Sequence, residues 1–159
     1  MSGREGTTYD THRPRRAGFS DRSLGVPDAS PGVLTGSSTD AGWTSLLLQR
    51  VRRKGSSRPF TPPPTPDVWI GVALRGTYEV TRRTPVGLRV TAYRPGAACL
   101  AHAGDPMEMS WSAGRDAVPF ETAHLFVPER FFDEALDHYR AAGSGVRRFP
   151  HAVPSSRTR

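Results

Sequence analysis

The amino-acid sequence predicts a mainly β domain, a sandwich or a barrel, followed by one amphipathic α-helix. Between residues 68 and 127, short runs of alternating apolar side chains recur at intervals of roughly 8–12 residues, with turn residues between them. The hydrophobic period then changes at Pro128 from that of a strand to that of a helix. These two observations define the predicted fold class.

The chain has 159 residues, which is enough for one domain with tails. Residues 1–41 are rich in Gly, Ser, Thr, Pro, Asp and Arg and have no apolar period. We therefore expect this segment to be disordered, because it has too little apolar surface to offset chain entropy. Residues 42–145 are the predicted domain, and residues 146–159 are expected to form a frayed tail.

The most regular alternation lies in residues 67–83. Residues 68–74 are predicted as a strand, and residues 77–82 as its hairpin partner, with a tight turn at Arg75-Gly76. The segment from Gly42 is a strand or a short helix, and the Pro-rich stretch that follows it is an extended loop. Further strands are predicted at residues 88–93, 99–100, 107–111 and 120–127.

The helix is predicted over about residues 128–142. Pro128 suits the first turn, and Gly143 suits a position just beyond the C-terminus. One stripe of the helix is apolar. Packing on the strand domain is one reading of this stripe, and an interface in a homodimer is the other. The residues that we assign to the candidate interface are Phe131, Phe132, Leu136 and Tyr139.

Several large apolar side chains on the predicted strands are candidates for the wall of a pocket inside the barrel. Filling of the hydrophobic core is the alternative role for the same residues. The candidate pocket residues are Trp69, Tyr78, Met107, Met109 and Trp111.

No catalytic signature is present in the sequence. There is no nucleophile elbow and no Gly-rich phosphate loop, and Cys99, flanked by apolar residues, is predicted to be a packed side chain. The five histidines are isolated, without the short spacings of metal ligands. We therefore expect no enzyme activity, no metal site and no cofactor.

The net charge of +7 is distributed unevenly. Residues 41–60 contain five basic residues and no acidic one, including the run "RVRRKGSSR" at 50–58. Such a run can contact phosphate or an acidic partner, but we interpret it as the solvated charge of a linker. The sequence has no secretory signal and no apolar run long enough to span a membrane, so we expect a soluble, cytoplasmic protein.

The order of four motifs resembles the N-terminal region of AraC-type transcriptional regulators. These motifs are "PDVWIGVALRGTYEVTRR", "YRPGAACLAHAGDP", "MSW" and "FETAHLFVPERFF", and the resemblance covers about residues 42–145. It implies a cupin-like β-barrel of the jelly-roll type that senses a small-molecule effector, followed by helical dimerisation.

In that family a DNA-binding domain of two helix-turn-helix units follows the sensor. Only sixteen residues follow Gly143 here. We therefore expect the sensor half of such a regulator, truncated or separately encoded, with no DNA-binding residues of its own. DNA contact would require a helix-turn-helix module supplied in trans. The alternatives are a metal-dependent cupin enzyme and a nonspecific nucleic-acid-binding basic protein.

Overall fold

The structure is a computed structural model, and it describes residues 18–84, 86–102, 104, 107–113 and 118–142. Its helical elements are α1 (Asp21–Leu24), α2 (Val26–Ala29), the 3-10 helix η1 (Ser38–Ala41) and α3 (Glu129–Ala141). Its strands are β1 (Val33–Ser37), β2 (Leu47–Arg53), β3 (Asp67–Arg75), β4 (Tyr78–Thr84), β5 (Gly87–Tyr93), β6 (Ala98–Ala101), β7 (Met109–Ser112) and β8 (Phe120–Pro128).

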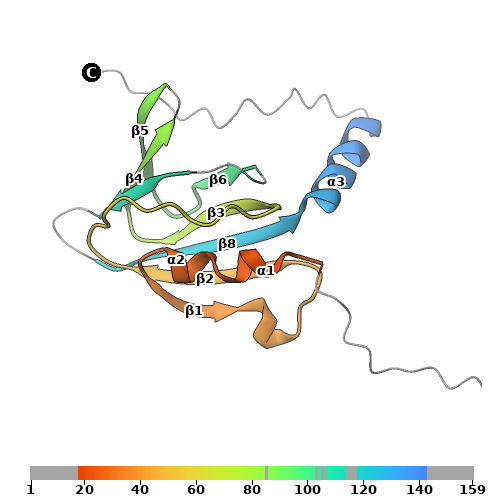
Figure 1. Ribbon diagram of the computed structural model, residues 1–159, viewed down its shortest axis with the longest axis horizontal. Coiled ribbons are helices and arrows are strands. Elements are labelled where there is room, and N and C mark those ends of the chain that lie inside the picture. The colour runs from red at the N-terminus through yellow and green to blue at the C-terminus, as the bar shows by residue number, and fades with distance from the viewer. Residues whose placement is uncertain (1–17, 85, 103, 105–106, 114–117, 143–159) are drawn as a thin grey trace, which may run out of the picture.

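The strands form two antiparallel sheets (Figure 1). The larger sheet has the order β1-β2-β8-β3-β6, and the smaller has the order β5-β4-β7. The mainly β fold class with a C-terminal helix is therefore confirmed. Each run of alternating side chains predicted as a strand is one, and the segment from Gly42 contains strand β2 rather than a short helix.

The predicted hairpin of residues 68–82 is wrong, although both of its strands exist. Strand β3 pairs with β8 and β6 in the larger sheet, whereas β4 pairs with β5 and β7 in the smaller one. The turn at Gly76 thus carries the chain from one sheet to the other. Gly76 has a φ of 77°, and a Cβ built on it would lie 2.8 Å from Cβ of Phe120. Only glycine fits this crossover without strain.

The prediction of disorder over residues 1–41 is wrong for residues 18–41, which form α1, α2, β1 and η1. The buried carboxylate of Asp67 orders this segment, because its Oδ2 accepts hydrogen bonds from the backbone N–H of Ser20 at 2.7 Å and the hydroxyl of Ser23 at 2.6 Å. The short polar residues that make the segment resemble a disordered chain therefore form specific contacts with the sheet.

The remaining parts of the two predicted tails, residues 1–17 and 146–159, lie outside the described residues. In the ordered part, Phe19 and Val26 pack in one buried cluster with Leu47 of β2 and Phe126 of β8. The α1–α2 segment consequently covers β2 (Figure 1), on the face of the larger sheet that carries these inward side chains.

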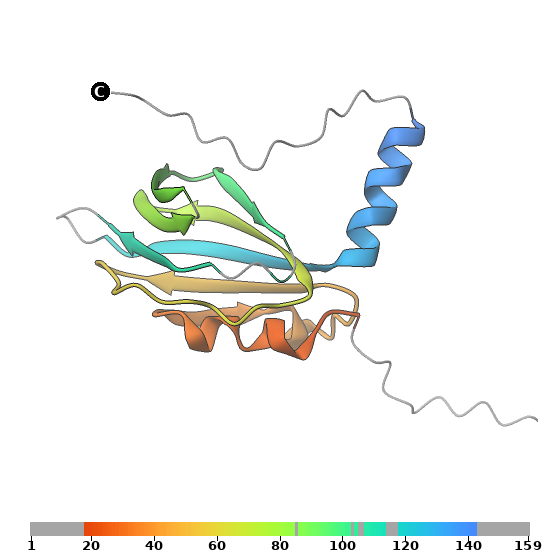
Figure 2. The same ribbon diagram turned by 45° about the horizontal axis from the view of Figure 1, so that its top comes forward.

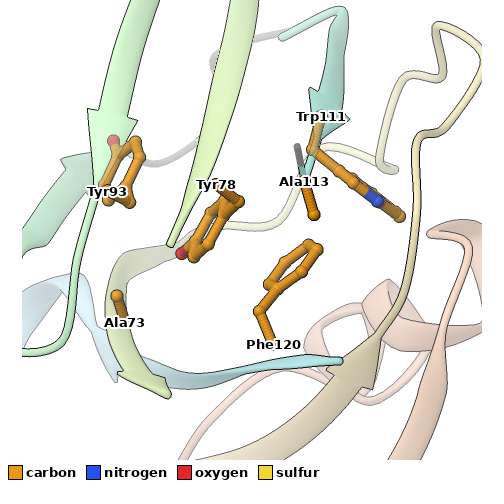
Figure 3. Packing of buried hydrophobic residues seen from close by; sticks show 6 residues of the cluster. All are labelled: Ala73, Tyr78, Tyr93, Trp111, Ala113 and Phe120. Carbon is orange, nitrogen blue, oxygen red and sulfur yellow. The ribbon is translucent and has the colours of Figure 1, made fainter. Parts of the chain in front are cut away.

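Aromatic side chains fill the space between the two sheets (Figure 3). The ring of Tyr78 stacks on Phe120 with centroids 4.1 Å apart, and on its other side it stacks on Tyr93 at 5.3 Å. Trp111 meets Phe120 edge-on at 6.2 Å. Both sheets contribute to this cluster, so it holds them together.

Helix α3 leaves the end of β8 and stands away from both sheets (Figure 2). None of its residues is fully buried. Phe131, Phe132 and Leu136 are half-buried, and Tyr139 is 61% exposed. The exposure of this apolar stripe is therefore compatible with both predicted roles, packing on the domain and a subunit interface. Among the described residues, no helix combines the length and the apolar character needed to cross a lipid bilayer.

Candidate ligand-binding site

A cavity of about 60 Å³ lies between the two sheets. This volume has room for roughly four water molecules, so it exceeds an ordinary packing defect. The structure brings all five predicted pocket residues together on its wall: Trp69, Tyr78, Met107, Met109 and Trp111. They come from β3, β4 and β7 and the residues just before β7, so the alternation of the strands turns their side chains to one interior space.

Aromatic rings form a large part of the apolar wall. Phe60, from the extended Pro-rich segment, meets Trp111 edge-on with centroids 5.1 Å apart. That segment is held beside β7 because Phe60 and Met109 exchange two backbone hydrogen bonds of 2.9 Å. Four of the residues on the wall, Tyr78, Tyr93, Trp111 and Phe120, are visible in Figure 3.

The polar end of the cavity is built around Arg53. Its side chain donates hydrogen bonds from Nη1 to the hydroxyl of Thr122, at 2.5 Å, and from Nη2 to the hydroxyl of Ser30, at 3.0 Å. Its guanidinium carbon lies 4.9 Å from the centroid of the Trp111 ring, within range of a cation–π interaction. The residue is only 6% exposed.

Our interpretation of the run 50–58 as solvated linker charge is therefore wrong for Arg53. Strand β2 has a strict alternation of burial, in which Arg50 and Arg52 are exposed and Val51 and Arg53 are buried. The side chain of Arg53 follows the inward face of the strand into the protein.

Arg53 is a buried cation without an ion-pair partner among the described residues, whose ion pairs are Arg50–Glu121, Arg83–Glu108 and Arg140–Asp137. Burial lowers the pKa of Arg53 to about 10, which leaves it charged at neutral pH. Among the described residues that line the cavity there is no Asp or Glu, whereas a second arginine, Arg82, is one of them. The described wall consequently carries positive charge and no negative charge.

His124 lies next to this cation and is neutral at physiological pH. Burial, reinforced by the charge of Arg53, lowers the pKa of its imidazole to about 3. Its Nε2 lies 3.1 Å from the hydroxyl oxygen of Thr122. Its ring also contacts Trp69 edge-on, with centroids 5.0 Å apart. His124 is therefore a buried histidine of the core.

The described residues do not fit a metal centre. Nowhere in the described part of the chain do three His, Cys, Asp or Glu side chains converge on a common point. The described residues of the cavity wall include one imidazole, His124, and one thiol, Cys99, and no carboxylate. His102 and His138 are exposed on the surface, and His12 and His151 lie outside the described residues.

Sequence reasoning missed the whole polar end of the cavity: Ser30, Arg53, Thr122 and His124. One signal for Arg53 was present, because the alternation that places Leu47 and Gln49 on one face of β2 places Arg53 there as well. The same alternation places Thr122 and His124 on one face of β8 with Phe120 and Phe126, whereas Ser30 had no such signal, because only a contact with the distant Arg53 identifies it.

No protein-family model and no curated protein matches the sequence. Solved structures with a similar arrangement of strands include a sugar phosphate isomerase of the cupin superfamily from Silicibacter pomeroyi, at 18% identity and a TM-score of 0.43, over 70% of this chain and 69% of that one. A cupin-2 domain protein from Shewanella frigidimarina is similar at 12% identity and a TM-score of 0.37, over 51% and 69% of the two chains.

The vicilin from Solanum melongena is similar at 11% identity and a TM-score of 0.44. That match covers 55% of this chain and only 22% of the vicilin. Similarity at this level describes an arrangement of strands rather than an activity. The structure itself shows the mainly β domain with two antiparallel sheets and a C-terminal helix that the sequence predicted.

Proposed function

We propose that this chain is a small-molecule-sensing domain without catalytic activity, of the kind found in the N-terminal region of AraC-type regulators. The observation that supports this most is the cavity between the sheets, whose wall is aromatic and whose polar end is one buried arginine. A concave, mostly apolar site with a few placed polar groups is the usual form of a small-molecule site.

The contact between Arg53 and Ser30 gives the site a route to the surface. Ser30 lies at the end of α2, so the guanidinium joins the cavity to the N-terminal segment. A ligand that binds Arg53 competes with Ser30 or reinforces its position. In either case the stability of the α1–α2 segment depends on occupancy, which is the requirement for a sensor.

Helix α3 is the second element through which a signal can leave the domain. It begins directly after β8, the strand that carries Thr122 and His124 on the cavity wall. Its half-exposed stripe of Phe131, Phe132 and Leu136 is available to a second copy of the chain. In this proposal the DNA-binding function belongs to a separate helix-turn-helix module.

The proposal is tested by hydrogen exchange on the full chain, after a thermal-shift screen of small apolar and amphiphilic compounds. We expect a compound that raises Tm to change the exchange of residues 18–30, and mass spectrometry to recover it chemically unchanged. Conversion of the compound would contradict the absence of catalysis. A screen in which no compound raises Tm would contradict ligand sensing.

A matched pair of variants assigns binding to the cavity. Val80→Phe adds bulk at a residue on the cavity wall, whereas Val90→Phe makes the same change at a position that is 59% exposed on the neighbouring strand. Only Val80→Phe is expected to abolish the thermal shift.

A further inference from the structure

We propose that the cavity recognises a small carboxylate whose anionic group binds at Arg53 and whose apolar body contacts the aromatic wall. This inference rests on the proposed ligand-sensing function and specifies the chemical class of the ligand. Two independent observations lead to it: the charge of the described wall and the kind of hydrogen-bonding groups that it leaves without partners.

Burying the charged side chain of Arg53 costs free energy. A buried guanidinium loses most of its hydration, and it is stabilised when a fixed charge of opposite sign replaces the water. The groups that contact Arg53 are two neutral hydroxyls and an aromatic ring. Among the described residues on the wall, the other charged side chain is Arg82, which is also a cation. The neutralising group is therefore expected to come with the ligand.

Four buried side-chain atoms on the cavity wall lack a hydrogen-bond partner among the described residues. These atoms belong to four residues of the cavity wall: Arg53 Nε, Trp69 Nε1, Trp111 Nε1 and His124 Nδ1. The first three can only donate a hydrogen bond. The fourth unpartnered buried atom, in His124, is the one whose role depends on the tautomer.

The tautomer of His124 follows from the protons around Thr122. The Arg53 N–H can only donate, so the Thr122 oxygen accepts from it. Among the described groups in hydrogen-bonding contact with this hydroxyl, only Nε2 of His124 is able to accept the hydroxyl proton, so we assign Thr122 as the donor to Nε2. Since this neutral imidazole accepts at Nε2, its proton lies on Nδ1. We therefore assign all four unpartnered atoms as donors.

A wall with unpartnered donors, positive charge and no carboxylate complements a ligand that only accepts hydrogen bonds. A carboxylate matches the planar guanidinium and forms the stronger, charge-assisted kind of hydrogen bond. The cavity volume of about 60 Å³ and the aromatic surroundings limit the rest of the ligand to a small apolar group. A neutral alcohol or amide brings donors of its own and no charge.

The test is a titration of the ¹⁵N-labelled full chain, monitored through the indole N–H signals. The probes are acetate and propanoate, each compared with its nearly isosteric amide, acetamide or propanamide. We expect the carboxylates to shift the signals of Trp69 and Trp111 and to bind at least about 30-fold more tightly than the amides, as for a buried charge pair. Trp43, which is 50% exposed, is the internal reference for nonspecific effects.

Two variants separate recognition by Arg53 from the general basicity of the chain. Arg53→Met is expected to reduce carboxylate affinity to that of the amides. Arg52→Met removes the same charge from the exposed neighbouring position of β2 and should leave affinity within about twofold. If Arg53→Met does not fold, the comparison of carboxylate with amide in the natural sequence still decides the question.

Equal affinity of carboxylates and amides would overturn the carboxylate inference while supporting the cavity as a binding site. Displacement of the carboxylates by chloride at equal concentration would also overturn it, because the site would then accept any anion. If no probe or screened compound shifts Trp69 and Trp111, the ligand-sensing function and the carboxylate inference are both wrong.

Discussion

The guanidinium carbon of Arg53 lies 4.9 Å from the centroid of the Trp111 ring, at the boundary between the polar and aromatic parts of one cavity. In this pair, the packed ring of Trp111 stabilises the folded domain, whereas the buried charge of Arg53 does not. The Trp111 ring packs against Phe60 and Phe120 in the core, whereas Arg53 places an uncompensated charge there.

The two residues should therefore differ sharply when they are replaced in the ligand-free protein. Arg53→Met is expected to leave the free energy of unfolding unchanged or to raise it by up to about 2 kcal/mol, because an apolar side chain replaces a desolvated charge. Trp111→Ala is expected to lower it by roughly 3–5 kcal/mol. Urea denaturation measures both, and a large loss in Arg53→Met would show that its hydrogen bonds outweigh its desolvation.

Gly76→Ala tests the crossover between the sheets. The substitution combines a positive φ with a Cβ placed 2.8 Å from Cβ of Phe120, so we expect a loss of roughly 2–4 kcal/mol in the free energy of unfolding. Gly42→Ala is the matched control, since Gly42 has a φ of 75° and no atom within 4 Å of its added Cβ. It should cost about 1 kcal/mol, and equal losses in the two variants would exclude the steric contribution of Phe120.

Asp67→Asn tests how the N-terminal segment is attached. The variant weakens the acceptor for Ser20 and Ser23, and hydrogen bonds to charged groups contribute about 1.5–3 kcal/mol. We expect faster proteolysis and faster hydrogen exchange in residues 18–30, with the sheets retained. Asp137→Asn, in an exposed ion pair with Arg140, is the control and should change stability by less than about 1 kcal/mol. Unchanged exchange in residues 18–30 would contradict the role of Asp67.

The buried His124 predicts a dependence of stability on pH. Its pKa is lowered to about 3 in the folded protein, whereas an unfolded histidine titrates near 6.5, so below pH 6.5 the unfolded state binds the extra proton. This contribution to stability is present above pH 6.5 and is lost as the pH falls, by up to about 1.4 kcal/mol per pH unit. His124→Phe should reduce that slope between pH 6 and 4, and equal slopes in urea titrations of the two proteins would contradict the assignment.

The apolar stripe of α3 predicts self-association. If two copies pair through it, sedimentation equilibrium should detect a dimer, and Tyr139→Glu should weaken it at least tenfold because a charge would enter an apolar interface. Leu88→Glu changes another exposed apolar residue, on β5, and should leave the association unchanged. A natural protein that is monomeric at all concentrations would mean that the stripe serves only to pack against the ends of β3 and β8.

The strands and the five pocket residues could be predicted because each strand has one face toward the interior, and that face is visible as local alternation. The pairing of β3 with β4 was predicted wrongly for a related reason. Adjacent strands separated by a two-residue turn usually form a hairpin. Here β3 instead pairs with β8 and β6, and β4 with β5 and β7, so the partners of both strands lie elsewhere in the sequence and leave no local signal.

Arg53 was misinterpreted because a charged residue in a basic run is usually solvated. The side chain is buried because Ser30 and Thr122 pack around its guanidinium, and these two partners are far apart in the sequence. The order in residues 18–41 was missed in the same way, since the carboxylate that fixes this segment belongs to Asp67. Composition describes a segment in isolation, whereas these contacts are tertiary.

The central position of β8 in the larger sheet affects how the chain folds during synthesis. Leu47 of β2 pairs with Phe126, and Trp69 of β3 pairs with the same residue from the other side. Neither β2 nor β3 can form these pairs until β8, the last strand of the sheet in the sequence, has been synthesised. The larger sheet therefore joins strands that are far apart in the sequence, and its central pairings form only after β8 has been synthesised. Until β8 has been synthesised, the inward faces of β2 and β3 are exposed. At this stage, binding by a chaperone would protect the largest apolar surface.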